Sequence, residues 1–449
     1  MRAKDMTVGK PLSLMIGFAL PMIAGNICQQ LYTMVDAAFV GRGAGTQALA
    51  AVGAADWFNW VVMGVIWGYT QGFSVLISQY FGAGEQKNMK RAVGLSISLT
   101  TAISLILILL SQLLICPVLR LLQTPDDIFS QSELYLRILF AALPILGAYN
   151  VQAGILRAVG NAKAPLVAML IASGINIALD ALFVMVFHWG VAGAAVATVI
   201  AQGASAVYCL IIIRKIPDIR FEKEDLFWHR AIGRRLLALG TPLAAQNTVI
   251  GVGGMVIQRV VNPYQSAFIA GYTATNKLYG LLEMAAASLG GALGAYTGQN
   301  FGAQKMDRVK SGVRVGAYLA LGVSLVVSAA LLLSGRSLLS LFVDPNEPQV
   351  SYVLDVGQQY LNTMLYALPS LYLLWVYRSA LQGMGDTLIP MVSGLVEFAM
   401  RVGVALTLPV LMGPSGIFIG EIAAWIGAAI LLTITYYWKI AKITHRREC

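Results

Sequence analysis

Charged side chains are scarce in this chain of 449 residues. Asp, Glu, Lys and Arg together make up 12% of the sequence, whereas hydrophobic residues make up 58%. Water-soluble domains carry about 25% charged residues, so this chain has too little polar surface to be solvated by water. The composition predicts a protein that is embedded in lipid.

The motifs of soluble enzymes are also missing. The one Gly-Lys pair, at positions 9 and 10, is followed by proline, so the sequence has no phosphate-binding loop. The three histidines, His188, His229 and His445, stand alone, and no Gly-x-Ser-x-Gly elbow occurs. We therefore expect neither catalysis nor ATP-driven transport, and no cofactor.

The four cysteines are too far apart to form a metal-ligand motif. Cys28, Cys116 and Cys209 lie in or beside apolar runs, and Cys449 ends the sequence. We expect them to be inert packing residues.

Long apolar runs recur along the whole chain. A helix needs about 20 mainly apolar residues to cross the hydrocarbon core of a membrane. The runs lack the alternation of barrel strands and are too long for them, so we predict an all-α integral membrane protein. The first run continues to Val40 without a cleavage site, which indicates a span rather than a removed signal. The twelve predicted spans lie near residues 13–38, 50–77, 93–116, 133–156, 165–187, 190–213, 236–261, 268–297, 313–334, 353–377, 388–411 and 415–438.

The basic residues are distributed unevenly between the connections. On this topology 24 of the 31 Lys and Arg residues, Arg157 and Arg378 among them, fall on one side of the membrane. Lys and Arg are enriched on the cytoplasmic side, so we predict a multi-pass protein of the cell membrane with both termini cytoplasmic. This bias explains the net charge of +10, which therefore does not indicate nucleic-acid binding. The other side holds Arg42, Arg120 and Arg336, with Asp126, Asp127, Asp344 and Glu347 nearby.

Short motifs recur at matching positions in the two halves of the chain. QYFGA at 79–83 corresponds to QNFGA at 299–303, and LRAVGNAKAP at 156–165 corresponds to LQGMGDTLIP at 381–390. A repeat of six spans begins and ends on the same side, so the halves share one orientation and are related by an axis along the membrane normal.

The longest and most polar cytoplasmic connection divides these halves. We therefore predict two pseudo-symmetric six-helix lobes, at 1–213 and 236–449, joined by a linker at 214–235. Duplications of this kind usually enclose a central cavity that opens to each side in turn.

Ionisable side chains inside the apolar runs are candidate functional residues, because a charge at the centre of a bilayer costs about 2.5–3.5 kcal/mol on insertion scales. Two carboxyls of the first half belong to matched patterns with spacings of three and four residues, which place each pattern on one helix face. A pair of such faces can share a proton or surround a hard cation with oxygen atoms. The alternative is that each carboxyl only hydrogen-bonds a neighbouring helix. The patterns are Gln29, Tyr32 and Asp36, and Ser173, Asn176 and Asp180.

The second half offers three further carboxyls. Glu283 continues a polar face with Asn276, and we expect it to attract cationic substrate. Glu397 and Arg401 are four residues apart, so we expect them to neutralise each other along their own helix. Glu421 faces either a cavity or a partner helix.

Polar residues in the spans supply candidate ligands for a substrate. Aromatic and Met residues such as Trp60, Met63 and Trp67 are expected to pack, although some can line a pocket for flat organic cations by cation–π contact. The candidate substrate-binding residues are Gln29, Asn150, Gln246, Asn276 and Glu283.

Over essentially its whole length, the chain resembles the multidrug and toxic compound extrusion (MATE) transporters, and most closely their DinF-like branch. The resemblance is carried by the duplicated spans, by the paired loops QYFGAGE (79–85) and QNFGAQK (299–305), and by ALPMIAGN (19–26), VDAAFVG (35–41) and LRAVGNAKAP. It implies two six-helix lobes that export cationic, amphipathic compounds in exchange for protons or sodium ions.

The DinF-like resemblance also implies a coupling site in the N-terminal lobe. That branch has an Asp on the first span, Asn and Asp four apart on the fifth, and a Thr on the sixth, and two tyrosines hydrogen-bond around them. Another branch carries acidic coupling residues on the seventh and tenth spans. This chain has no Asp or Glu there apart from Asp355 at the edge of the tenth span, so we expect no such site in the C-terminal lobe. The matching positions are Asp36, Asn176, Asp180 and Thr198, which would hold H⁺ or Na⁺, and Tyr32 and Tyr135.

The favoured interpretation is a secondary antiporter that exports small organic cations or drugs, with the lipid bilayer as its surroundings and no obligatory protein partner. The alternative is a flippase for lipid-linked saccharide precursors, which should line its cavity with several Arg or Lys to hold a pyrophosphate. Intramembrane basic residues are few here, chiefly Arg137, Lys277 and Arg401. A channel or an intramembrane enzyme is the remaining alternative.

Overall fold

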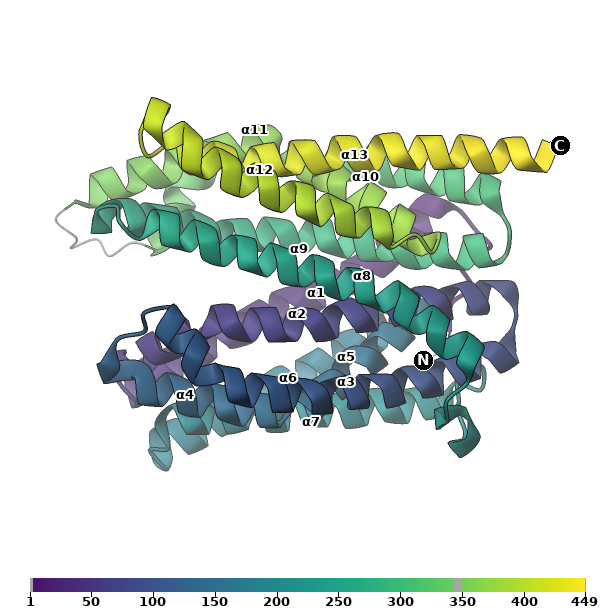
Figure 1. Ribbon diagram of the computed structural model, residues 1–449, viewed down its shortest axis with the longest axis horizontal. Coiled ribbons are helices and arrows are strands. Elements are labelled where there is room, and N and C mark those ends of the chain that lie inside the picture. Colours follow the sequence, from purple (N-terminus) through teal and green to yellow (C-terminus); the bar gives the residue numbers. More distant parts are fainter. Residues whose placement is uncertain (1–2, 343–348, 449) are drawn as a thin grey trace. The chain divides into compact units, whose positions relative to one another are not determined.

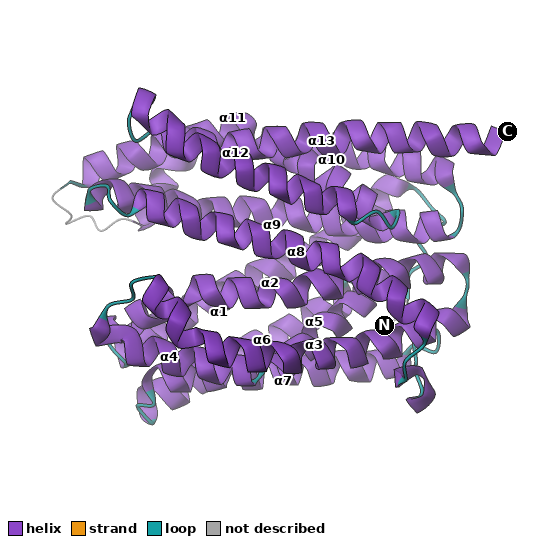
Figure 2. Ribbon diagram, viewed as in Figure 1, coloured by secondary structure: helices purple, strands orange, loops and turns teal. Residues whose placement is uncertain are grey.

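The computed structural model describes residues 3–342 and 349–448, and this part of the chain is helical with no strand (Figure 2). Asp344 and Glu347, which the topology prediction used, lie outside the described residues. The all-α class is confirmed. Contacts divide the chain into two compact units, whereas the lobe boundaries at residues 213 and 236 stay a prediction. The first unit comprises Met1–Val8, Gly17–Thr248 and Gly302–Gln304, and the second comprises Gly9–Ile16, Val249–Phe301 and Lys305–Cys449.

The first unit is a bundle of long helices whose axes run roughly side by side (Figure 1). α2 is its central helix and packs against α3, α4 and α5, while α7 packs against α5 and α6. Its elements are most of α1 (Pro11–Gly43), α2 (Thr46–Ala83), α3 (Gln86–Leu121), α4 (Asp126–Ala141), α5 (Leu143–Ala158), α6 (Lys163–Asp180), a π-helical turn η1 (Ala181–Val186), α7 (Gly190–Lys215), a short 3₁₀ helix η2 (Lys223–Leu226) and most of α8 (Arg230–Val261).

Small residues let helices of this unit approach closely. A Cβ atom added to Gly72 of α2 would lie 2.5 Å from the Cα atom of Gly240 in α8, so only glycine fits there. In a membrane, helices associate through such close packing because lipid gives no hydrophobic drive between them.

The second unit is built from the C-terminal helices. α11 packs against α10 and α13, and α12 packs along α13. Its elements are the end of α8, α9 (Ser266–Gly302), α10 (Met306–Leu339), a 3₁₀ turn η3 (Ser340–Phe342), α11 (Val350–Gly383), α12 (Leu388–Met412) and α13 (Gly416–Glu448).

The apolar helices are almost as many as the sequence predicts. Of the described helices, ten are long and apolar enough to cross a membrane, and the number is eleven if α4 and α5, bent by 54° at Ala142, are counted together as one span. The predicted span that is not among these is the tenth, at 353–377. It lies in α11, which has 34 residues. Its polar residues, among them Gln358 and Asn362, make α11 less apolar than the other spans.

The matched motifs of the two halves adopt the same turn. Gly160 and Gly385 both have a positive φ, of 78° and 83°, which glycine adopts without steric cost. In each case the next residue closes the turn: the amide of Asn161 donates to Leu156 O at 2.9 Å, and that of Asp386 donates to Leu381 O at 3.0 Å. The sequence repeat is therefore also a structural repeat.

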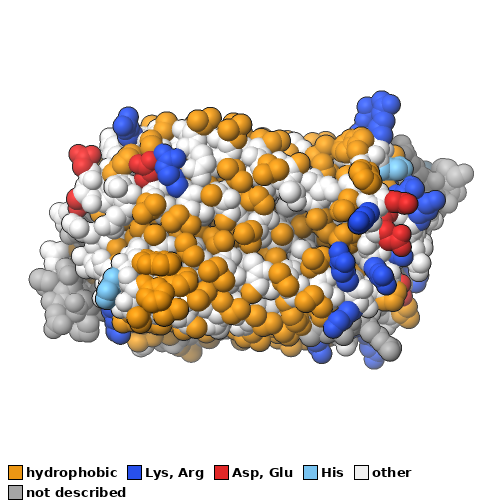
Figure 3. All heavy atoms as spheres, turned by 90° about the horizontal axis from the view of Figure 1, so that it is seen from below, with side chains coloured by type: hydrophobic (Ala, Val, Ile, Leu, Met, Phe, Trp, Pro, Cys, Tyr) orange, Lys and Arg blue, Asp and Glu red, His pale blue; other side chains and the backbone are white. Residues whose placement is uncertain are grey.

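The surface is that of a membrane protein. On the face drawn in Figure 3, hydrophobic side chains cover the middle, and Lys and Arg gather mainly toward one end. Large apolar residues such as Leu333 and Val410 are 91% and 83% exposed. Such exposure is unfavourable in water and favourable in lipid.

Candidate substrate cavity and coupling site

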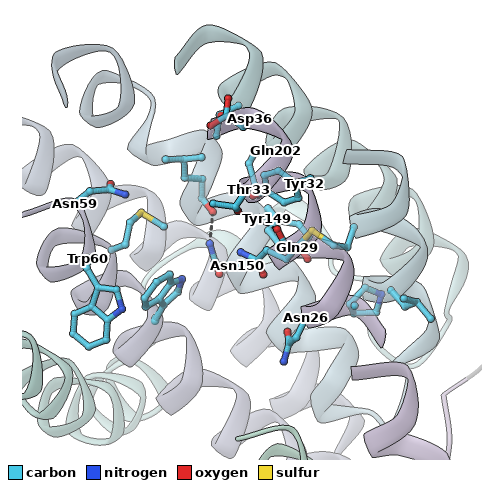
Figure 4. Close-up of a pocket in the computed structure, with 18 of the residues that line it drawn as sticks. Asn26, Gln29, Tyr32, Thr33, Asp36, Asn59, Trp60, Tyr149, Asn150 and Gln202 are labelled. Atoms are coloured by element: carbon cyan, nitrogen blue, oxygen red, sulfur yellow. Dashed lines mark hydrogen bonds between the residues drawn. The ribbon is translucent and has the colours of Figure 1, made fainter. Parts of the chain in front are cut away.

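A cavity of about 580 Å³ lies inside the first unit. Residues of six helices, α1, α2, α4, α5, α6 and α7, form its wall. α1 contributes a continuous face, from Pro21 through Gln29 and Tyr32 to Asp36. The fifteen residue steps from Pro21 to Asp36 rise about 22 Å along the helix, so the cavity follows α1 for much of its length. Figure 4 shows the polar residues of this wall, including Asn59, Tyr149, Asn150 and Gln202.

Two carboxyl groups from different helices meet at this wall. Asp36 of α1 lines the cavity and is 8% exposed, whereas Asp180 of α6 is fully buried and does not line it. The two carboxyl groups interact directly, and they can share a hydrogen bond once one of them carries a proton. Asp36 thus separates Asp180 from the cavity.

This pair lacks hydrogen-bond donors. Among the described residues, none donates to Asp36 Oδ1 or to either carboxyl oxygen of Asp180. The side-chain amide of Asn176, one turn before Asp180, is also buried and unpaired. A buried polar group without a partner costs roughly 1–3 kcal/mol, and two ionised carboxylates also repel each other. A proton or a cation bound here would remove both penalties.

The backbone changes directly after Asp180. The α-helix ends at this residue and continues as the π-helical turn from Ala181 to Val186. Wider turns of this kind occur frequently at functional sites because they reorient side chains within a helix. No feature of the sequence predicts this turn.

The remaining predicted coupling residues also line the cavity. Tyr32 lies within hydrogen-bonding reach of Gln202 and close to Asp36. Tyr135 of α4 lies near Asp36, and Thr198 contributes from α7. Four of the six predicted residues therefore share one wall, with Asn176 and Asp180 outside it, but their coupling roles stay predictions.

The groups near Asp36 and Asp180 offer oxygen atoms as ligands. Within residues 3–342 and 349–448 there is no group of three or more His, Cys, Asp and Glu side chains that could hold a metal ion. Asp36, Asn176, Asp180 and Thr198 offer two carboxyls, one amide and one hydroxyl. Oxygen atoms are the ligands that hard cations prefer, so Na⁺ and H⁺ both remain candidate ions.

The predicted substrate ligands are divided between several places. Gln29 and Asn150 line the cavity, although Asn150 Nδ2 already donates to Leu146 O at 2.8 Å (Figure 4). Gln246 belongs to the same unit but is buried and lies outside the cavity wall. Asn276 and Glu283 lie on α9 in the second unit, where the hydroxyl of Tyr360 donates to Asn276 Oδ1 at 3.3 Å.

Sequence reasoning missed a second acidic residue in the cavity. Asp56 of α2 lines the wall together with Trp60, Met63 and Trp67, which we had expected to be packing residues. Their spacing of three and four residues gives one helix face, and this is the signal that could have identified them. The rings of Trp60 and Trp67 meet edge to face, with centroids 6.1 Å apart.

Arg157 is a second missed residue. The topology prediction counted it in a cytoplasmic connection, but it belongs to the last turn of α5 and lines the cavity. It forms no ion pair with another described residue. Tyr135 on α4 lies beside Asp36. Arg157 lies at the far end of α5, the helix that follows α4. The cavity therefore has an acidic end at Asp36 and a basic end at Arg157.

The second unit contains two ion pairs between helices. Arg378 of α11 pairs with Glu397 of α12, and both side chains are 6% exposed. Arg401 of α12 pairs with Glu421 of α13 at 2.7 Å. Our expectation that Glu397 and Arg401 pair along their own helix is therefore wrong, because each finds a partner on a neighbouring helix. Arg378 is likewise a buried helical residue and not part of a cytoplasmic connection.

Glu283 lies near this charged cluster. Glu421, Arg401 and Glu397 all act on it electrostatically, and the hydroxyl of Tyr279 lies within hydrogen-bonding reach. Arg401 is already paired with Glu421, so Glu283 is an acidic group without an ion-pair partner among the described residues.

Known proteins resemble the chain over its whole length. The probable multidrug resistance protein YpnP of Bacillus subtilis (strain 168) is 29% identical over 457 residues, a match that covers 99% of each chain. The probable multidrug resistance protein NorM of Thermotoga maritima is 24% identical over 92% of this chain and 88% of that protein.

Solved structures show the same fold. A MATE protein crystallised in its bent conformation superposes with a TM-score of 0.91, 21% identity and coverage of 100% of both chains. A transporter of the MOP superfamily from Pyrococcus furiosus gives a TM-score of 0.91 and 21% identity, with 99% of both chains covered.

The family assignment rests on the duplicated architecture as well. The profile of the family described as MatE matches residues 21–182 and, separately, residues 242–407. The two matches fall in the two halves that share the Gly160 and Gly385 turns, and together they cover most of the sequence. The chain belongs to the MatE family of membrane transporters.

Proposed function

We propose that this protein is a secondary antiporter that exports cationic or amphipathic organic compounds in exchange for H⁺ or Na⁺. The observation that carries the proposal is the contact between Asp36, in the cavity wall, and the buried Asp180, three of whose four carboxyl oxygens accept no hydrogen bond from a described residue. The names of the relatives, which describe multidrug resistance proteins, support organic compounds as the exported class.

Exchange requires that the ion and the substrate compete or favour different conformations. When the ion leaves, the acidic end of the cavity carries negative charge and attracts a cationic compound. When a proton or Na⁺ binds between Asp36 and Asp180, this attraction is lost and the compound is released. Asn176, Thr198, Tyr32 and Tyr135 would supply the surrounding polar atoms.

Helix α1 is the element that would connect ion binding to movement. It carries Asp36 and contains Pro21, which cannot donate a backbone hydrogen bond and so marks a bending point. Both residues line the same cavity. A change of bend at Pro21 after ion binding at Asp36 would therefore alter the volume that is available to the substrate.

The cavity wall suits flat amphipathic compounds. Trp60 and Trp67 offer aromatic faces, and Gln29 and Asn150 offer polar groups. Aromatic rings bind organic cations by cation–π contact, and in sites shielded from water this contact contributes about 2 kcal/mol or more to the binding energy. Glu283 in the second unit would add a further attraction for cations.

A lipid-linked saccharide flippase fits the cavity less well. Such a protein has to neutralise a pyrophosphate, and Arg157 is the one basic residue among those that line the cavity. Arg137 and Arg401, which the sequence also offered, are paired with Glu133 and Glu421 at 2.6 and 2.7 Å.

We further propose that the protein is located in the cell membrane, with both termini in the cytoplasm. The basic bias of the sequence supports this orientation, and so do the Lys and Arg side chains near one end of the surface in Figure 3.

Transport into proteoliposomes tests the function. We expect a fluorescent organic cation to move when a proton gradient or a sodium gradient is imposed, and the gradient that works identifies the ion. Passive ion conductance without substrate movement would instead indicate a channel. Movement of lipid-linked saccharides without an ion gradient would favour the flippase.

A further inference from the structure

A groove of about 550 Å³ lies at the surface of the second unit, between α10 and α13. Lys310 and Arg314 of α10 line one side, and Thr444 of α13 lines the other. Tyr436 and Ile440, both largely buried, form its inner wall. The lining residues in the described part of the chain include basic, aromatic and apolar side chains but no Asp or Glu.

The two cations of α10 have no acidic partner among the described residues. Lys310 and Arg314 are four residues apart, so they project from one face of the helix. Neither forms an ion pair with any residue that the structure describes. Two cations held at one groove repel each other and create a positive potential, which favours binding of an anion.

The corresponding place in the first unit is filled by the chain itself. Helices α3 and α10 follow the matched QYFGA and QNFGA motifs, and Gly94 is the ninth residue of α3 as Arg314 is of α10. A Cβ atom on Gly94 would lie 2.5 Å from Asp225 O, and Ser98 Oγ donates to Leu226 O at 2.9 Å. The acidic helix η2 therefore covers this face of α3.

The second unit differs at the matched position. There the glycine of the first repeat is replaced by the exposed Arg314, which lies beside α13, a helix that continues to Glu448. Where the acidic η2 covers α3, α10 therefore presents a cation to the groove, and this favours an anionic occupant.

The groove continues into apolar surface on both helices. On α10, Arg314 is followed on the same face by Tyr318 and Leu325, which are 69% and 59% exposed. On α13, Tyr437, Ile434 and Ile430 repeat at spacings of three and four residues and are 57%, 64% and 54% exposed. An anion bound at the cations would therefore carry apolar chains along these faces.

We propose that this groove binds an anionic phospholipid, with the phosphate at Lys310 and Arg314 and the acyl chains along α10 and α13. Basic pockets between membrane helices on the cytoplasmic side commonly hold such headgroups. Tyr318 and Tyr437 have the amphipathic character of residues at the level of the headgroups. The site is separate from the cavity of the first unit and does not depend on the transport proposal.

Native mass spectrometry of the full-length protein in neutral detergent tests the site. We expect phosphatidylglycerol to bind about tenfold or more tightly than phosphatidylcholine, since each basic residue contributes about 1 kcal/mol to anionic lipid binding. Lys310→Gln with Arg314→Gln should abolish this preference, and Lys310→Arg with Arg314→Lys should keep it.

A matched control removes two charges from the other repeat. Lys87→Gln with Arg91→Gln, also four residues apart near the start of α3, should leave the preference for phosphatidylglycerol unchanged. The proposal is overturned if the Lys310 and Arg314 double variant binds phosphatidylglycerol as well as the unaltered protein does. It is also overturned if millimolar inorganic phosphate displaces the lipid, because the groove would then be a site for soluble anions.

Discussion

Asp36 and Asp180 come from helices α1 and α6, and their carboxyl groups meet where one lines the cavity and the other is completely buried. The residues are 144 positions apart in the sequence, so only the fold brings them together. Because Asp36 lines the cavity and Asp180 does not, an ion that enters from the cavity meets Asp36 first.

We therefore expect Asp36→Asn and Asp180→Asn each to insert normally and to lose gradient-driven export. Asparagine keeps the shape of the side chain but cannot exchange a proton and binds Na⁺ more weakly. The measurement is uptake of a fluorescent cation into proteoliposomes at matched protein levels. Full transport by both variants would place the coupling carboxyl elsewhere.

The spans could be predicted from sequence because lipid imposes a simple requirement on them. A helix that crosses a membrane needs a long apolar run, and such runs are visible without knowledge of the fold. The break at Ala142 was not visible in this way, since α4 and α5 together form one apolar run. The repeat was also visible, because Gly160 and Gly385 occupy matching motifs.

Partners between helices were harder to predict. The spacing of Glu397 and Arg401 indicated a pair on one helix, but packing places Arg378 and Glu421 closer. The sequence shows which charges are present, but the packing of the helices determines which of them form ion pairs. Arg157 was missed for a related reason: from sequence alone, the end of a helix that faces a cavity looks the same as a cytoplasmic connection.

The pair between Arg378 and Glu397 should be important for stability. Removal of one member of a buried ion pair costs about 3–5 kcal/mol, because the other charge stays buried without a partner. We expect Arg378→Gln to lower the thermal unfolding temperature in detergent strongly. Arg336→Gln is the control, since its pair with Asp355 is more than half exposed and contributes about 1 kcal/mol or less. Equal effects of the two substitutions would contradict the expectation.

Glu283→Gln should weaken export of cations more than export of neutral compounds. In its ionised form the carboxyl attracts a cation, because the nearby Arg401 is already neutralised by Glu421, and glutamine cannot ionise. Initial rates for one cationic and one neutral dye, at matched protein levels, measure this difference. If both rates fall equally, Glu283 has a structural or a coupling role instead.

The topology can be tested with single cysteines on a cysteine-free background. Asp218, in the connection after α7, should react with a membrane-impermeant reagent only from the cytoplasmic side. Gln123, in the connection between α3 and α4, should react from the opposite side of intact cells. Labelling of both positions from the same side would contradict the predicted orientation.

Arg157 should determine whether the transporter accepts compounds that carry an acidic group. It lies at the end of the cavity opposite Asp36 and has no ion-pair partner within the described part of the chain, so a carboxylate of the substrate can serve as its partner. The matched motif of the second half has Gln382 at this position, which shows that the turn forms without a cation. We therefore expect Arg157→Gln to fold and to export the ester rhodamine 6G normally. Its free acid, rhodamine 19, should be exported about tenfold more slowly, since a charge-assisted hydrogen bond contributes about 1.5–3 kcal/mol. Equal loss for both dyes would mean that Arg157 supports the structure and does not select the substrate.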